Sequence, residues 1–250
     1  SLLKQKKKIP AVIWIQTAIT FVAFVILFMA PGNEMRVASE ITTWMPGYKE
    51  LSVGKHLFMT IQWMLSSFAN EGKAFFIAIW TAGFLLLMKS KKAKVYQILA
   101  VVFSVVALLP YAGISFFSEM GIGYIDIEQR LTELPTWQTM NIQNRIAFFW
   151  WIAAVLFTMV LLWKVTGHSV FISMVFLGGI ASEAVLHFSP TIYASGARVY
   201  YLTDLMYLFI ILWMVMHMDS EKKKNLFIAG VVVLGVANFL SQYSIMLLKL

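Results

Sequence analysis

Two carboxylates lie inside apolar segments near the carboxyl end of the chain. Glu183 is six residues before Ser189, and Asp204 is six residues after Arg198. At 1.5 Å per helical residue, each acid would lie about 9 Å inside the boundary of its apolar segment. Ionisable side chains are costly at that depth in a membrane, which makes them functional candidates by default. The two acids therefore predict a polar pocket in which a carboxylate could accept a proton.

Further polar residues lie one helical turn from these acids or from each other, and residues four apart share a helical face. The predicted pocket, besides Glu183, includes His187, Tyr200, Asp204, Asn238 and Gln242. The alternative is that these side chains only form polar contacts that hold neighbouring helices together.

A predicted anion site follows the first apolar segment, where Pro31-Gly32-Asn33 precedes Arg36. Pro and Gly are expected to end the helix and open a tight turn, and Asn tolerates a left-handed backbone. Exposed amides beside an arginine form a plausible anion site. The alternative is a plain helix end with an arginine that faces lipid headgroups.

A second predicted anion site lies between the fifth and sixth apolar segments, in the stretch from Ser189 to Arg198. Ser195 can cap the helix that follows, and helix N-termini favour anions. Arg198 adds a planar guanidinium suited to phosphate. The alternative is an ordinary capped turn with an arginine that extends towards the interface.

The composition indicates which elements must position these residues. Of the 250 residues, 60% are hydrophobic and 13% are charged, whereas a soluble domain has about 25% charged residues. Runs of about 20 apolar residues match the thickness of a bilayer. We therefore expect one all-α membrane domain over residues 1–250. Its seven predicted spans are about 9–30, 72–88, 95–117, 146–166, 169–188, 198–217 and 226–248.

The lysines predict the orientation of these spans. Lysine blocks at 4–8, 89–94 and 222–224, together with Lys164, fall on one side of the membrane if the N-terminus is cytoplasmic. The C-terminus and two long loops, 31–71 and 118–145, are then outside. We expect an interfacial or re-entrant helix at 56–69 in the first of these loops. A full span there would invert the topology after it.

The two arginine motifs carry a resemblance to known proteins. Pro31-Gly32-Asn33 with Arg36, and Ser189-Pro190 with Arg198, resemble motifs of bacterial multi-pass proteins grouped with GT-C-type glycosyltransferases. The resemblance covers most of the chain. It implies a bacterial cytoplasmic-membrane enzyme that transfers a sugar from a polyprenyl-phosphate donor to a surface glycan on the outer face.

The resemblance also suggests roles for particular residues. Asn33, Arg36, Ser195 and Arg198 would bind the lipid phosphate. The candidates for the catalytic base that deprotonates the acceptor hydroxyl are Glu34, Asp126 and Glu183.

The chain departs from the family pattern near its beginning. Family members are longer upstream and carry an acidic motif on their first outside loop, whereas Glu34 and Glu40 do not form such a pair here. Because the chain begins at Ser1, we expect either the C-terminal portion of a longer enzyme, which would require an N-terminal half or partner subunit, or a reduced relative.

Other functions stay open at this point. A transporter or flippase for a lipid-linked sugar, or a non-catalytic accessory subunit, would fit the same segments. The sequence has no cysteine and no nucleotide, metal or nucleophile-elbow motif. We therefore expect no metal, no cofactor other than the lipid-linked substrate, and no nucleic-acid partner.

Overall fold

The computed structural model describes residues 19, 22, 32–44, 47–112, 142–187 and 200–247, and every regular element within these residues is helical. The longer helices are α2 (Gly32–Trp44), α3 (Val53–Ser67), α4 (Lys73–Leu87), α5 (Lys94–Leu108), α7 (Ile142–Val165), α8 (Val170–His187), α10 (Tyr201–Met216) and α11 (Glu221–Leu247). The short ones are the 3₁₀ turns η1 (Tyr48–Glu50), η3 (Lys91–Ala93) and η4 (Leu109–Ala112), and the π-helical segment η2 (Phe68–Gly72).

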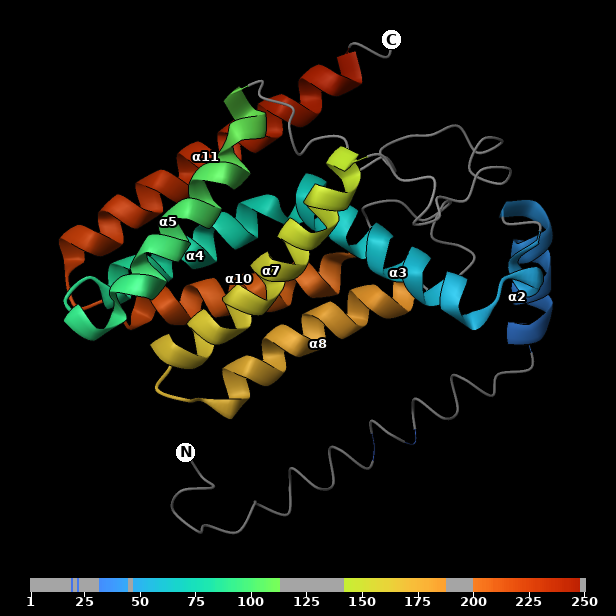
Figure 1. Ribbon diagram of the computed structural model, residues 1–250, viewed down its shortest axis with the longest axis horizontal. Helices are drawn as coiled ribbons and strands as arrows, with labels where there is room; N and C mark the ends of the chain where they lie inside the picture. Colours follow the sequence, from blue (N-terminus) through green and yellow to red (C-terminus); the bar gives the residue numbers. More distant parts are fainter. Residues whose placement is uncertain are drawn as a thin grey trace.

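Helix α4 lies at the centre of a bundle and packs against α5, α7, α10 and α11 (Figure 1). Its Phe76 and Trp80 are completely buried. The Phe76 ring centroid lies 5.7 Å from that of Trp80, 5.6 Å from those of Trp151 and Tyr207, and 6.3 Å from that of Phe176. This aromatic cluster joins α4 to α7, α8 and α10.

Helices occupy all six predicted spans that fall within the described residues. The first predicted span, 9–30, lies outside them except for two helical positions, Ile19 and Val22. Among the described residues, 144–165 of α7 form the one helix that is both long and apolar enough to cross a membrane, while 170–186 and 201–216 form shorter apolar helices. The structure thus gives an all-α fold with one candidate membrane span, and the seven-span topology stays a prediction.

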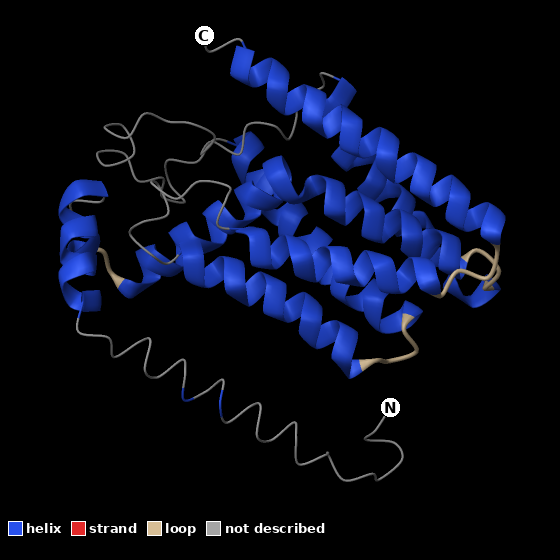
Figure 2. Cartoon of the chain, turned by 180° about the vertical axis from the view of Figure 1, so that it is seen from behind, coloured by secondary structure: helices blue, strands red, loops and turns tan. Residues whose placement is uncertain are grey.

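The interfacial or re-entrant helix expected at 56–69 is present as a helix, and its position relative to a membrane stays a prediction. Helix α3 continues through η2 into α4 without a break (Figure 2). The second half of α3 packs against α7 and α8, and Gln62, Trp63 and Ser66 are buried there. Apolar and small polar side chains alternate around this helix, so it can fit inside the bundle.

The predicted turn after Pro31 differs from the structure. Gly32 and Asn33 belong to α2, so the described part of this segment is helical where a turn was expected. The predicted loop 31–71 is therefore mostly helical, from α2 to η2.

Three connections that contain or adjoin lysines lie at one end of the bundle, between α4 and α5, α7 and α8, and α10 and α11 (Figure 1). Asp219, between α10 and α11, forms ion pairs with Lys89 and Lys223. The Lys223 ammonium also donates a hydrogen bond of 3.1 Å to the Leu85 carbonyl. Hydrogen bonds from these two lysines lower the pKa of Asp219 to about 2. The contacts tie the first and third connections together.

Candidate functional site

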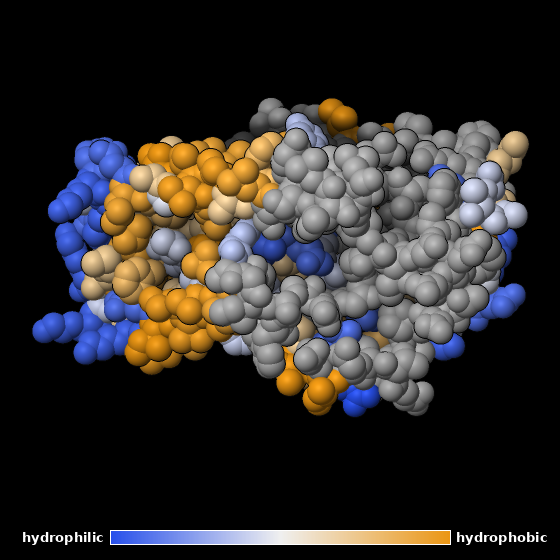
Figure 3. All heavy atoms as spheres, turned by 90° about the horizontal axis from the view of Figure 1, so that it is seen from above, coloured by the Kyte–Doolittle hydropathy of each residue, from blue (hydrophilic) through white to orange (hydrophobic). Residues whose placement is uncertain are grey.

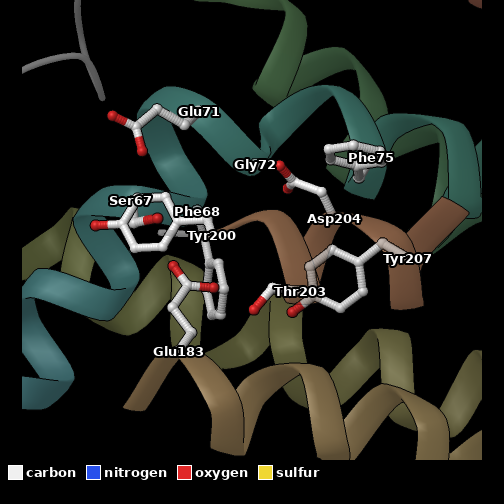
Figure 4. A pocket seen from close by; sticks show the side chains of 10 residues that line it. All are labelled: Ser67, Phe68, Glu71, Gly72, Phe75, Glu183, Tyr200, Thr203, Asp204 and Tyr207. Carbon is white, nitrogen blue, oxygen red and sulfur yellow. The ribbon is translucent and has the colours of Figure 1, made fainter. Parts of the chain in front are cut away.

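A polar cavity of about 200 Å³ lies between α8, α10 and the junction of α3 with α4. Figure 4 shows the side chains that line it. Three carboxylates come from three segments: Glu71 from η2, Glu183 from α8 and Asp204 from α10. The other lining residues are Ser67, Phe68, Gly72, Phe75, Tyr200, Thr203 and Tyr207. We call this cavity the acidic pocket.

The π-helical segment explains how Glu71 reaches this pocket. A π-helical turn is a single-turn widening that often marks a functional site. Between Phe68 and Gly72 it widens the helix, while the Asn70 side-chain amide donates to the Ser66 carbonyl at 2.9 Å. Ser67, Phe68, Glu71, Gly72 and Phe75 then all line the acidic pocket.

Close packing of α8 and α10 forms the opposite wall of the pocket. A Cβ atom at Gly179 would lie 3.0 Å from the Tyr207 ring, so glycine permits this approach. The Thr203 hydroxyl donates to the Gly179 carbonyl at 3.2 Å. Glu183, one turn further along α8, is 2% exposed. Residues 200, 203, 204 and 207 follow helical spacing, which puts the pocket-lining side chains of α10 on one face.

The hydroxyl of Tyr207 stands out within the pocket. The side chain is 1% exposed, and its oxygen has no hydrogen-bond partner among the described residues. A buried hydroxyl without a partner costs about 1–3 kcal/mol.

A second cavity, of about 410 Å³, lies on the other side of α4, between α4, the end of α5 with η4, and α11. Its walls are apolar and include Ile77, Leu108, Tyr111, Gly230 and Leu234. A Cβ atom at Gly230 would meet no atom of the described residues within 4 Å, so these residues leave the cavity open there. We call it the apolar groove.

A buried lysine lies at one end of the apolar groove. Lys73 precedes the groove residue Ile77 by one turn of α4, so both share a face. Its ammonium lies 4.7 Å from the centre of the Tyr111 ring, which lines the groove. The positive charge therefore lies next to the apolar surface, at the end of α4 that adjoins the acidic pocket.

The structure brings three of the predicted pocket residues together, since Glu183, Tyr200 and Asp204 line one cavity. The backbones of His187, Asn238 and Gln242 are helical, but their side chains lie outside the described residues. Helix α11, which carries Asn238 and Gln242, packs against α4 and η4 and lines the apolar groove.

The predicted anion sites are described only in part. Asn33, Glu34 and Arg36 belong to α2, but their side chains lie outside the described residues. Asp126, Ser195 and Arg198 lie outside them altogether. The structure therefore does not test whether Arg36 approaches Arg198.

Several site residues were missed by reasoning from the sequence. They are Ser67, Glu71, Lys73 and Thr203. The signal for two of them was present, because Glu71 and Lys73 stand between apolar runs in the stretch Asn70-Glu71-Gly72-Lys73. The prediction placed Glu71 in an outside loop, so its charge appeared to need no buried partner.

Among the described residues, no group of three or more His, Cys, Asp or Glu side chains is arranged to hold a metal ion. Comparisons with protein-family models, curated proteins and solved structures found no match for this chain. The functional argument therefore rests on the two cavities and on the motifs.

Proposed function

We propose that this chain is a multi-pass membrane protein that transfers a sugar from a polyprenyl-phosphate donor to a hydroxyl group of a surface glycan. One observation carries the proposal: α4 separates the acidic pocket from an apolar groove that has a buried lysine at its end. The apolar groove suits the prenyl chain of a lipid phosphate, and the adjacent positive charge suits its phosphate group. The carboxylates of the acidic pocket suit an acceptor hydroxyl.

The surface of the bundle supports a membrane location. Large apolar side chains are exposed along α5, α8, α10 and α11, including Val233 at 68% and Phe239 at 66% on α11. Figure 3 shows one face of the molecule, on which an apolar area lies beside a hydrophilic end. Monomeric soluble proteins rarely expose an apolar patch larger than a few hundred Å². Several bilayer-crossing helices would bury this surface in lipid.

The apolar groove fits the chain of a lipid. Its open position at Gly230 and its apolar walls leave room for a prenyl chain beside α4 and α11. The Lys73 ammonium would pair with the phosphate, as predicted for Arg36 and Arg198. A charge-assisted contact of this kind is worth about 1.5–3 kcal/mol.

The acidic pocket would supply the base for the reaction. A carboxylate, with Glu183 as the leading candidate, takes the proton of the acceptor hydroxyl while the acceptor oxygen forms a bond to the anomeric carbon of the sugar. The bond between that carbon and the phosphate oxygen breaks, and the phosphate leaves with the electron pair. Positive side chains lower the barrier by stabilising this departing charge.

A variant that fills the groove tests the lipid site. We expect Gly230→Leu to abolish detectable binding of a polyprenyl phosphate, because the new side chain occupies the groove. Gly235→Leu is the matched control, since Gly235 also lies on α11, meets no atom within 4 Å and does not line the groove. Native mass spectrometry of the purified protein with added lipid measures binding. Equal binding by both variants would refute the lipid site.

The transferase activity needs its own assay. Membranes that contain the protein are supplied with a radiolabelled lipid donor, and label in the glycan is counted. Glu183→Gln should bind the lipid normally and transfer no sugar. Lipid binding without transfer by the parent protein would instead favour the flippase alternative and refute the enzyme.

A further inference from the structure

We propose that the turn between α4 and α5 binds the headgroup of an anionic phospholipid. This turn, residues 88–94, carries four lysines: Lys89, Lys91, Lys92 and Lys94. We call it the lysine turn. Binding there requires a membrane location for the chain, but neither the apolar groove nor the transfer of a sugar.

Positive charge exceeds negative charge at this end of the bundle. The three connections and the helix ends beside them carry eight lysines and two acids, Asp219 and Glu221. Asp219 pairs with Lys89 and Lys223, and Glu221 pairs with Lys224 at 2.7 Å. The other five lysines are exposed and have no ion pair within the described residues: Lys91, Lys92, Lys94, Lys164 and Lys222.

The positive charge does not depend on the parts of the chain outside the described residues. Every residue of the three connections is described. The helix ends that flank residues 113–141 and 188–199 lie at the opposite end of the bundle (Figure 1). Residues 1–18 contain lysines and no acid. An anion at the lysine turn would therefore meet a net positive charge.

The protein itself holds the lysine turn in place. The Gln97 side-chain amide donates to the Leu87 carbonyl at 2.6 Å and to the Ser90 carbonyl at 3.1 Å. The Ala93 N–H also donates to the Ser90 carbonyl, at 3.0 Å, and the Ala93 side chain is completely buried. A turn that is already ordered loses little conformational freedom when a ligand binds, which favours binding.

Exposed apolar side chains beside the lysines favour a lipid over a soluble anion. Met88, Val95 and Ile98 are each at least half exposed. Ile98 lies one helical turn after Lys94, on the same face of α5. A phospholipid has the same order of parts, a charged headgroup followed by apolar chains. A nucleic acid or an acidic peptide would contact the lysines and leave the apolar side chains uncovered.

Two lipids with identical acyl chains test the charge requirement. Native mass spectrometry of the detergent-purified protein measures the binding of phosphatidylglycerol, which is anionic, and of phosphatidylcholine, which is zwitterionic. We expect phosphatidylglycerol to bind roughly tenfold more tightly, because clustered lysines attract anionic headgroups. The alternative, that the lysines only orient the chain in the membrane, predicts equal binding. Equal binding of the two lipids overturns the inference.

Variants locate the binding on the lysine turn. Lys91→Gln combined with Lys92→Gln should weaken phosphatidylglycerol binding roughly tenfold and leave phosphatidylcholine binding unchanged. Lys49→Gln combined with Lys55→Gln is the matched control, because it also removes two exposed lysines, from η1 and α3. Both double variants should keep the melting temperature of the parent in lipid-free detergent. Unchanged phosphatidylglycerol binding in the first double variant, or an equal loss in both, overturns the inference.

Soluble anions show whether the acyl chains contribute. Inorganic phosphate and polyglutamate are added, at equal concentrations of negative charge, to the protein with bound phosphatidylglycerol. Neither should displace the lipid, because neither covers the apolar side chains beside the turn. Displacement by phosphate would overturn the inference in favour of a soluble anion, and displacement by polyglutamate would overturn it in favour of an acidic protein.

The lysine turn and the apolar groove can be tested separately. Gly230→Leu, which fills the groove, should bind phosphatidylglycerol as the parent protein does. Loss of phosphatidylglycerol binding in this variant would place the lipid in the groove and overturn the inference. Normal phosphatidylglycerol binding by a protein that neither binds polyprenyl phosphate nor transfers sugar would support the lysine turn and refute the proposed function.

Discussion

At the scale of single residues, buried polar groups in the bundle differ in whether the protein itself satisfies them. The Trp80 indole N–H donates to the Thr158 hydroxyl at 2.7 Å, and that hydroxyl donates to the Ala154 carbonyl at 2.7 Å. Both side chains are completely buried. This pair has a structural role that joins α4 to α7, whereas the Tyr207 hydroxyl lines a cavity and has no partner among the described residues.

The Thr158 hydroxyl should therefore matter for stability. Thr158→Val keeps the shape of the side chain but leaves the Trp80 N–H buried without an acceptor, so we expect a loss of about 1–3 kcal/mol. Thr158→Ser retains the hydroxyl and should lose less. Thermal unfolding in detergent, followed by tryptophan fluorescence, measures both. Equal melting temperatures for Thr158→Val and the parent would show that the hydrogen bond contributes nothing.

At the scale of helices, a glycine permits the close contact between α4 and α7. A Cβ atom at Gly83 would lie 2.7 Å from Cδ2 of Leu161, and Leu161 is completely buried. Small residues allow helix backbones to approach closely in membranes. The Leu161 side chain cannot move into open space, so the contact cannot relax cheaply.

Gly83→Ala should destabilise the bundle by about 1–3 kcal/mol through overpacking. Gly235→Ala is the matched control, because it also lies within a long helix but meets no atom within 4 Å. That variant should be neutral or up to about 1 kcal/mol more stable, because alanine favours helices. Denaturation of both purified variants in detergent decides between these outcomes. A Gly83→Ala protein as stable as Gly235→Ala would contradict the close packing.

At the scale of the whole molecule, the lysine connections share one end of the bundle (Figure 1). Lys92 lies in the connection between α4 and α5, and Lys223 lies in the first turn of α11. The ion pairs of Asp219 with Lys89 and Lys223 hold these two regions together. Because cytoplasmic loops are rich in lysine, this end should face the cytoplasm.

Cysteine labelling tests that orientation. Because the chain has no native cysteine, single cysteines at Lys92, Lys223, Glu128 and Ser195 can be compared directly. An impermeant thiol reagent on intact cells should label positions 128 and 195, and should label 92 and 223 only after the cells are opened. Labelling of 92 but not 128 in intact cells would refute the topology.

The sequence by itself determined the helical class and the position of six helices. Apolar runs of span length that are bounded by lysines can adopt few conformations other than a helix. It also identified Glu183 and Asp204, since an acid within an apolar run is costly wherever the run folds. The sequence also identified Tyr200 as a pocket residue, because it lies one helical turn from Asp204 on the same face. These properties depend on local composition and on periodicity.

Only the tertiary structure decided which side chains of other helices lie next to these residues. The burial of the second half of α3 depends on α7 and α8, which pack against it, and Glu71 enters the acidic pocket from a π-helical segment that the sequence does not mark. Tyr207 is an ordinary aromatic residue of an apolar helix until Gly179 of α8 packs against its ring. Likewise, Lys73 lies beside the apolar groove only because α4 places its ammonium over the Tyr111 ring. Contacts between distant segments depend on how helices pack, and the spacing of residues within one helix cannot specify them.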